Sequence, residues 1–97
     1  MEFEWDDAKN RSNLAKHGLS FEDAEQVLDG PCLTFQDTRF DYGEERYAAA
    51  GLLSGRLVVI AYSIRDETPR IISMRKGNRR EQRVYQERFG EGRPYER

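Results

Sequence analysis

Apolar residues recur at helical spacing in the first third of the chain. A first helix is predicted from a cap at Asp6 or Asp7 to about residue 17, where Gly18 ends it. A second helix is predicted to begin at Ser20, with Asp23 in its first turn, and to stop at residues 29–31. Its apolar face combines Phe21, Ala24, Val27 and Leu28.

The hydrophobic period changes from Cys32 onward, where alternation indicates strands. Strands are predicted over residues 32–37, 46–53 and 56–64, with an acidic loop at 37–45 and a tight turn at Ser54-Gly55. The run Leu57–Tyr62 is apolar on both faces, which is typical of a central strand that is covered on both sides. Residues 2–5 also alternate and predict a short edge strand.

The last strand and the last helix follow one another closely. The strand is predicted over Arg70–Arg75, and Gly77 interrupts it. Asn78, with Glu81 three residues later, has the spacing of a capping box, so a helix is expected from there to about Phe89.

The order of these elements predicts the fold class. It is α+β: a small antiparallel sheet of about four strands, preceded by two helices and followed by one C-terminal helix. Residues 1–97 form a single domain in this interpretation, and residues 90–97 are expected to be a frayed tail.

Composition excludes several classes of protein. Of 97 residues, 37% are hydrophobic, enough for one modest core. A single cysteine, Cys32, excludes an internal disulfide and predicts a small buried residue in a reducing compartment. One Cys and one His do not make a zinc or iron–sulfur ligand set, so no metal or cofactor is expected. No apolar run is long enough to span a bilayer, and a cytoplasmic protein is expected.

The charge is distributed unevenly along the chain. Residues 1–55 contain 5 Lys/Arg and 12 Asp/Glu, a net charge of -7, whereas residues 56–97 contain 11 and 6, a net charge of +5. A mixed solvated surface with internal ion pairs is one interpretation. We favour a basic face for nucleic acid in the C-terminal half.

Four cations meet at the junction between the last strand and the last helix: Arg75, Lys76, Arg79 and Arg80. Cations in the first turn of a helix are unfavourable, because the helix N-terminus carries a positive partial charge. The same arrangement is well suited to an anion such as phosphate. These residues are therefore candidates for RNA binding, together with Arg70 before the strand and Arg83 in the helix.

Candidate catalytic residues each have a structural alternative. Lys16 and His17 complement the dipole at the end of the first helix, although His17 is also the only side chain suited to proton transfer near neutral pH. Glu81 can be a general base, but capping explains it first. Tyr85 lies one turn after Glu81 and is better explained as part of the core face of the helix, although a tyrosine at its rim can stack on a base. Arg75 is the strongest candidate for phosphate stabilisation.

No nucleophile–His–acid set or phosphate-binding Gly loop is present. Cleavage of RNA does not require one, because the ribose 2′-OH is a built-in nucleophile. The protein need only orient the backbone, neutralise the phosphate and move protons.

Taken together, the sequence resembles the BrnT family of bacterial toxins, which have a RelE/ParE-like fold. The resemblance covers roughly residues 3–86. It rests on Phe3-Glu4-Trp5-Asp6, Lys9, Asn13, Lys16-His17-Gly18, Ser20-Phe21-Glu22-Asp23-Ala24, Glu44-Glu45-Arg46-Tyr47, Gly51, Arg65, Arg70 to Lys76, Arg79-Arg80-Glu81 and Tyr85. The family usually has Ala where Met74 and Gly77 stand, and Thr in place of Asn78.

This resemblance implies a toxin of a type II toxin–antitoxin pair that cleaves RNA and inhibits translation. It also implies a small BrnA-like antitoxin, whose complex with the toxin binds its own promoter DNA. Two other classes stay open: a ParE-like toxin that acts on gyrase without cleaving RNA, and a nucleic-acid-binding module without enzymatic activity.

Overall fold

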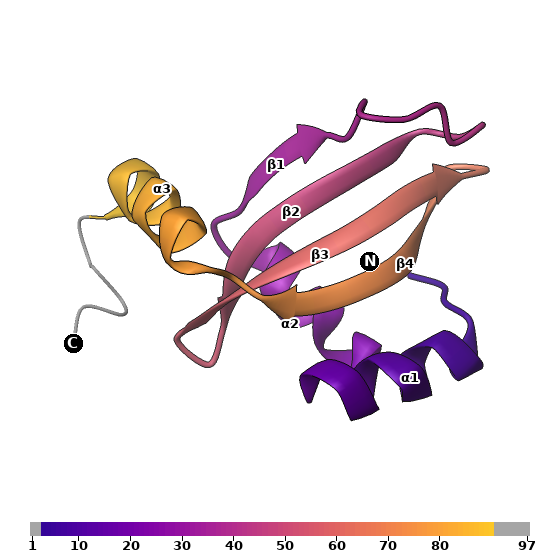
Figure 1. The fold of residues 1–97 in the computed structure, drawn as a ribbon, viewed down its shortest axis with the longest axis horizontal. Helices are drawn as coiled ribbons and strands as arrows, with labels where there is room; N and C mark the ends of the chain where they lie inside the picture. Colours follow the sequence, from indigo (N-terminus) through magenta and orange to yellow (C-terminus); the bar gives the residue numbers. More distant parts are fainter. Residues whose placement is uncertain (1–2, 91–97) are drawn as a thin grey trace.

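Two helical segments, four strands and a final helix follow one another along the chain (Figure 1). The structure is a computed structural model, and it describes residues 3–90. Its elements are α1 (Asp7–His17), a 3-10 turn η1 (Phe21–Asp23), α2 (Ala24–Asp29), β1 (Leu33–Gln36), β2 (Arg46–Leu53), β3 (Arg56–Arg65), β4 (Thr68–Lys76) and α3 (Arg79–Phe89). This is the predicted α+β order.

The strands form one antiparallel sheet in the order β1-β2-β3-β4. The register between β3 and β4 shifts after Ala61, which leaves Ile72 without a counterpart. The predicted strand over residues 2–5 is reduced to one parallel bridge between Glu4 and Arg70, and Glu2 lies outside the described residues. A lone bridge forms here because only Glu4 exchanges backbone hydrogen bonds, with Pro69 and Ile71.

The predicted helix boundaries are confirmed by their caps. Asp6 accepts a hydrogen bond from the Lys9 amide, and Gly18 ends α1 in the left-handed conformation at φ 72°. At α3, the Asn78 side chain accepts from the Glu81 amide at 2.8 Å, and the Glu81 carboxylate accepts from the Asn78 amide at 2.9 Å. The second helical segment begins differently. The Ser20 hydroxyl accepts a hydrogen bond from the amide of residue 22, and the segment starts as the 3-10 turn η1 rather than as an α-helix.

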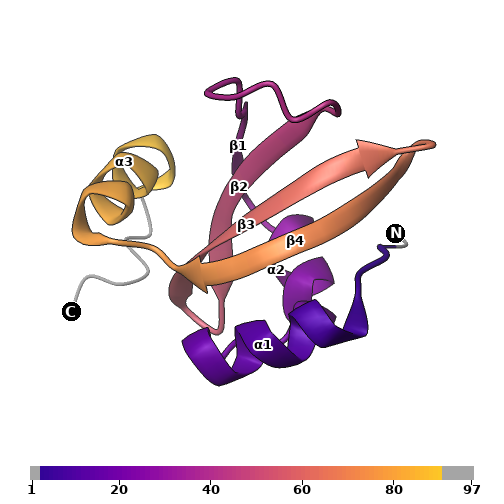
Figure 2. The same ribbon diagram turned by 45° about the vertical axis from the view of Figure 1, so that its right-hand side comes forward.

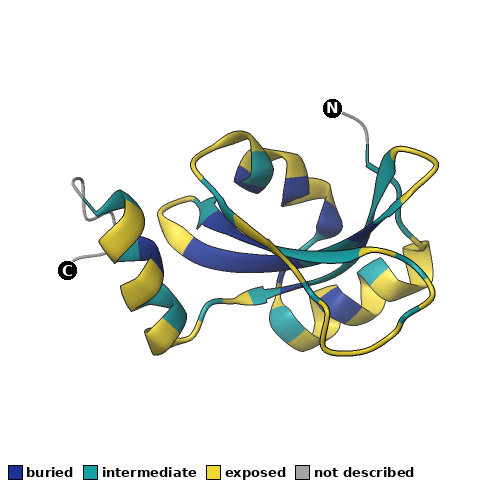
Figure 3. Ribbon diagram, turned by 90° about the horizontal axis from the view of Figure 1, so that it is seen from above, coloured by how far each residue is buried: buried dark blue, intermediate teal, exposed yellow. Residues whose placement is uncertain are grey.

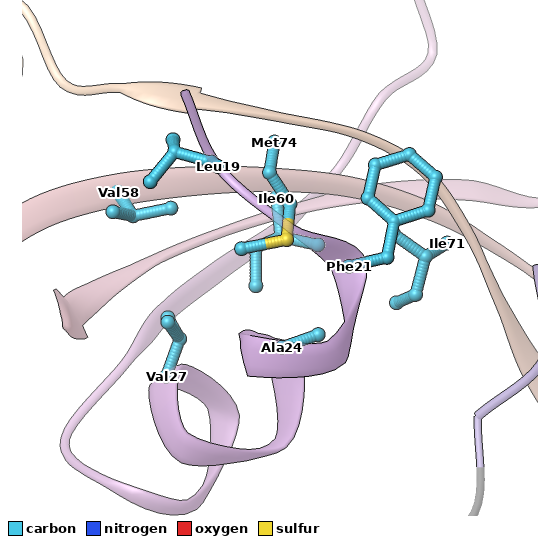
Figure 4. Packing of buried hydrophobic residues seen from close by; sticks show 8 residues of the cluster. All are labelled: Leu19, Phe21, Ala24, Val27, Val58, Ile60, Ile71 and Met74. Atoms are coloured by element: carbon cyan, nitrogen blue, oxygen red, sulfur yellow. The ribbon is translucent and has the colours of Figure 1, made fainter. Parts of the chain in front are cut away.

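The main core lies between the sheet and the η1–α2 segment (Figure 4). Phe21 and Val27 reach the sheet from the helical side and are fully buried. They meet Ile60 of β3 and Met74 of β4, which are paired in the register. The side chains of the whole cluster are Leu19, Phe21, Ala24, Val27, Val58, Ile60, Ile71 and Met74.

Gly51 allows α2 to approach β2 closely. A Cβ at this position would lie 2.9 Å from the Cys32 Sγ and 2.9 Å from the Val27 carbonyl oxygen. Contacts this short are not tolerated, so only glycine fits without a movement of the helix. Cys32 is half-buried rather than buried, its thiol donates to the Val27 carbonyl at 3.2 Å, and burial raises its pKa.

Helix α1 lies along the outer edge of β4 (Figure 2). Asn13 is buried there, and its side-chain amide both donates to the Met74 carbonyl at 2.9 Å and accepts from the Met74 amide at 3.1 Å. It also donates to the Leu19 carbonyl. Asn13 thus takes the place of a further strand and satisfies the edge of the sheet.

Helix α3 packs on the opposite face of the sheet. Tyr85 is 2% exposed and packs with Ala50, Leu57 and Val59, with Phe89 alongside. Its hydroxyl donates to the Pro31 carbonyl at 2.8 Å. β3 is therefore covered on both faces at this end, as its apolar run predicts (Figure 3). Because α3 sits beyond the end of the strands, it leaves most of this face open (Figure 1).

Candidate nucleic-acid site

The floor of the open sheet face is made of small side chains. In the register, Phe35 of β1 is followed across the sheet by Ala48, Ala61 and Ser73. Cross-strand neighbours share a face, so this row lies on the side of α3. Because the other three residues in the row are small, Phe35 stands above them, and it is 57% exposed.

A groove of about 370 Å³ lies between this floor and the first turn of α3. Ala48 and Val59 line its bottom, Phe35 and residues 36–39 one side, and Arg75 and Glu81 the other. A second hollow of about 330 Å³ adjoins it toward Arg80 and Val84 and shares Phe35, Val59 and Glu81 with it. The two hollows together give a trough that is apolar below and charged at its sides.

Arg75 and Glu81 form a bidentate ion pair at the border of the groove. The Arg75 Nη1 and Nη2 donate to the two carboxylate oxygens of Glu81 at 2.9 and 2.8 Å. This bond lowers the pKa of Glu81, against partial burial, which would raise it, and it raises the pKa of Arg75. Both groups are therefore charged at neutral pH, and the position of the guanidinium is fixed.

The ion pair corrects the prediction made for the strand–helix junction. Arg75 was expected to be one of four cations beside unoccupied helix amides, but Glu81 binds its guanidinium and the capping box takes up the amides of Asn78 and Glu81. Lys76, Arg79 and Arg80 are exposed, and within residues 3–90 they have no ion-pair partner. Arg83 is exposed one turn further along α3.

Arg70 lies apart from these residues. It stands near the start of β4, and its guanidinium is 3.6 Å from the Glu4 carboxylate. Since the same two residues form the bridge that holds the N-terminal segment, Arg70 has a structural part at that end of the sheet.

Lys16 and His17 line a separate hollow of about 210 Å³ at the edge of β4. Lys9, Ser73 and the buried Asn13 also border it. Ser73 and Arg75 are two residues apart in β4 and so point to the same side of the strand. This hollow and the groove therefore both adjoin β4, but they share no lining residue. The structure does not bring His17 into the groove with Arg75.

The position of Tyr85 favours the packing interpretation. Its ring lies in the core and its hydroxyl is bonded to a backbone carbonyl, so it does not line the groove. Glu81 fulfils the predicted capping role and, in addition, holds Arg75.

The acidic loop borders the groove in an ordered arrangement. Asp37 accepts hydrogen bonds from the Arg39 guanidinium at 3.0 Å and from the Tyr42 hydroxyl at 3.1 Å. The Arg39 bonds hold the pKa of the Asp37 carboxyl well below its usual range. Arg46 lies over the Tyr42 ring, 4.0 Å from its centroid. These contacts fix the loop that forms one side of the groove.

The part of the chain that the structure describes has neither a cluster of metal ligands nor a membrane-spanning helix. Residues 3–90 contain no cluster of three or more His, Cys, Asp or Glu side chains that is arranged to hold a metal ion. Among the helices of the same residues, none has the length and apolar character needed to cross a membrane.

Neither the Arg75–Glu81 pair nor the position of Phe35 in the groove was predicted from the sequence. The spacing of Arg75 and Glu81 crosses a strand–helix turn, where no simple periodicity predicts contact. Phe35 was expected only as an alternating strand residue. The sequence does contain one signal for the position of Phe35: an aromatic residue in the short strand β1, followed by the alanine-rich strand β2.

Comparison with known proteins identifies the family of the chain. A search among curated proteins gives no significant match. A family model described as the ribonuclease toxin, BrnT, of type II toxin–antitoxin systems matches residues 5–81. This range contains both helical segments, the whole sheet, and the junction from Arg75 to Glu81. The chain therefore belongs to the BrnT family of ribonuclease toxins of type II toxin–antitoxin systems.

Proposed function

We propose that this protein cuts single-stranded RNA without a metal ion, and that Arg75 stabilises the phosphate at the cleaved bond. Membership of a ribonuclease toxin family supports the reaction class. The observation that carries the assignment is the fixed guanidinium of Arg75 at the border of an open groove.

In the proposed reaction, the ribose 2′-OH loses its proton and attacks the adjacent phosphorus. The bond from phosphorus to the 5′ oxygen breaks, and that oxygen takes up a proton. The products are a 2′,3′-cyclic phosphate and a 5′-OH. Extra negative charge develops on the phosphate oxygens in between, and a guanidinium stabilises it by paired hydrogen bonds.

Arg75 has donors left for this task. A guanidinium carries five N–H groups, and the hydrogen bonds to Glu81 and to the Lys76 carbonyl come from Nη1 and Nη2 only. Its side chain is 43% exposed, so a phosphate can reach Nε and the outer side of the fork. We assign Glu81 as the positioning residue for Arg75, because a carboxylate with a lowered pKa is a weak proton acceptor.

The remaining cations suit the RNA backbone on either side. Lys76 is exposed at the end of β4, and Arg79, Arg80 and Arg83 are exposed on α3, where Arg80 also lines the second hollow. Lys16 and His17 lie at the edge of β4, next to Ser73, where a strand that leaves the groove would cross. Because His17 lies outside the groove that contains Arg75, we assign it with Lys16 to the RNA backbone rather than to proton transfer at the cleaved bond.

Cleavage by the purified protein tests this proposal. Single-stranded RNA should be cut equally well with and without EDTA, the products should end in 2′,3′-cyclic phosphate, and a 2′-deoxy nucleotide at the cleaved position should block the reaction. Arg75→Lys should lose much of the rate, because it keeps the charge but loses the fork. If chelation stops cleavage, or if folded Arg75→Ala cuts as fast as wild type, the assignment is wrong. RNA that is bound but never cut would favour a non-cleaving toxin or binding module.

We further propose that translation is the process this toxin inhibits, and that a BrnA-like antitoxin neutralises it and joins it in a complex that binds its own promoter DNA. The exposed cations of α3 support an acidic or nucleic-acid partner. A short neighbouring reading frame should encode the antitoxin. Expression of the toxin alone should arrest growth, and co-expression with that neighbour should restore it. Unrestricted growth with folded toxin present at levels shown by blot would contradict this.

A further inference from the structure

Phe35 is exposed without a structural reason. The residue is 57% exposed, and among residues 3–90 its ring has no ring or cation partner. Its neighbours across the sheet are too small to cover it. It lines both hollows of the trough, with the Arg75–Glu81 pair on the far side.

We infer that the groove binds an unpaired nucleobase, which stacks on Phe35 beside the phosphate held by Arg75. This deepens the proposed function and rests on it for the identity of the nucleic acid. The site therefore takes single-stranded RNA, because a base in a duplex is stacked on both faces and is not available to a side chain.

The shape of the groove fits a flat ring. Ala48 and Val59 give it a low apolar floor, and Phe35 forms an aromatic wall. Its volume lies within the range of small-ligand sites. An aromatic side chain offers a π-face to any base, so stacking holds the strand with little dependence on sequence.

The charges at the border favour a nucleotide over a purely apolar group. Arg75 borders the first hollow and Arg80 the second, on either side of the shared Glu81. A base on Phe35 would place its own phosphates toward these two guanidinium groups. A hydrophobic side chain of the antitoxin is the competing occupant, and the experiment separates the two.

The test uses a single-stranded oligonucleotide that is 2′-deoxy throughout, so that it cannot be cut, with one 2-aminopurine at successive positions. With wild-type protein, fluorescence should be quenched at the position that stacks. Phe35→Leu keeps an apolar side chain but removes the ring, so the quench should disappear and affinity should fall roughly 5- to 150-fold. Phe40→Leu is the matched control, because Phe40 is also exposed, at 66%, but lines neither hollow, and it should bind as wild type does.

The outcomes separate this inference from the proposed function. If wild type cuts RNA but folded Phe35→Leu binds and quenches as well as wild type, the base site is wrong and the function stands. If the quench depends on Phe35 but no RNA is cut, the base site stands and the function is wrong. If Phe35→Leu leaves oligonucleotide binding unchanged and weakens only the complex with the antitoxin, the groove is a protein-docking surface and the inference is overturned.

Discussion

At the scale of single residues, Glu81 is held by two different interactions. Its carboxylate caps α3 at the Asn78 amide and holds Arg75. Glu81→Gln keeps an oxygen for the cap but loses the charge, so we expect a loss of about 1 kcal/mol in the free energy of unfolding at pH 7, modest because the pair is partly exposed. Urea denaturation of the wild-type protein and of Glu81→Gln measures this loss.

The pH dependence of this difference follows from the pKa of Glu81. The folded protein lowers that pKa below its ordinary value of 4.5, so the carboxylate stabilises the fold above about pH 4.5. The stabilisation is lost as the pH falls through the folded value, and the two proteins should then become equally stable. A difference that persists unchanged at pH 2–3 would contradict the charge-based explanation.

Gly51 provides a residue-scale test of packing. Gly51→Ala places a methyl group 2.9 Å from both Cys32 Sγ and the Val27 carbonyl, so α2 must move, and we expect a loss of about 1–3 kcal/mol. Gly30→Ala is the control, because its Cβ would have only an ordinary contact of 3.9 Å. Thermal and urea unfolding of the two variants should differ clearly. Equal stability would mean that α2 does not sit as closely on β2.

At the scale of elements, local rules predicted most of the fold. The caps at Asp6, Gly18 and Asn78 depend on contacts within four residues, so the helix boundaries could be read along the chain. The strand β2 was predicted with its bounds, because alternation and the Ser54-Gly55 turn fix them together. How the helices lie on the sheet could not be predicted in this way, since it depends on contacts between distant segments.

In the candidate site, too, features that are local in the sequence could be predicted, whereas contacts between distant segments could not. The basic strand–helix junction was visible in the sequence because its cations are consecutive or nearly so. Phe35 and Arg75 are 40 positions apart, by their sequence numbers, and only the register through β2 and β3 brings them to one groove. His17 seemed a natural partner for Arg75 by chemistry, but α1 packs on the edge of β4 and places it in another hollow.

Asn13 is the clearest test of an element-scale contact. Asn13→Ala removes the bonds to both backbone groups of Met74, which stay buried at the edge of β4, so we expect a loss of about 1–3 kcal/mol. The Met74 amide should also exchange hydrogen faster. Ser12→Ala, at the exposed neighbouring position, should change neither quantity. Unchanged protection of Met74 in a folded Asn13→Ala protein would show that α1 does not complete the sheet.

At the scale of the whole molecule, the two faces of the sheet have different tasks. One face is covered by η1 and α2, which pack on the sheet to form the main core, and α1 closes the β4 edge. The other face carries α3 at one end only, so the core it forms is small and a groove stays open beside it. Arg75 of β4 and Arg80 of α3 line the hollows on this open side, and Arg79 and Arg83 are exposed on the same helix.

This separation predicts where salt will affect RNA binding. Each cation that neutralises a phosphate of single-stranded RNA contributes about -0.7 to the slope of log K against log salt concentration. Arg83→Ala, on the exposed side of α3, should therefore weaken binding and make the slope shallower by roughly 0.7, with little effect on the rate of cleavage once RNA is bound. Arg65→Ala is the control, because Arg65 is also exposed but lies at the other end of the sheet, at the turn between β3 and β4, where its partner is Glu44. Titrations over a range of salt concentrations should leave its slope at the wild-type value. If both variants shift the slope equally, RNA does not follow the face formed by α3.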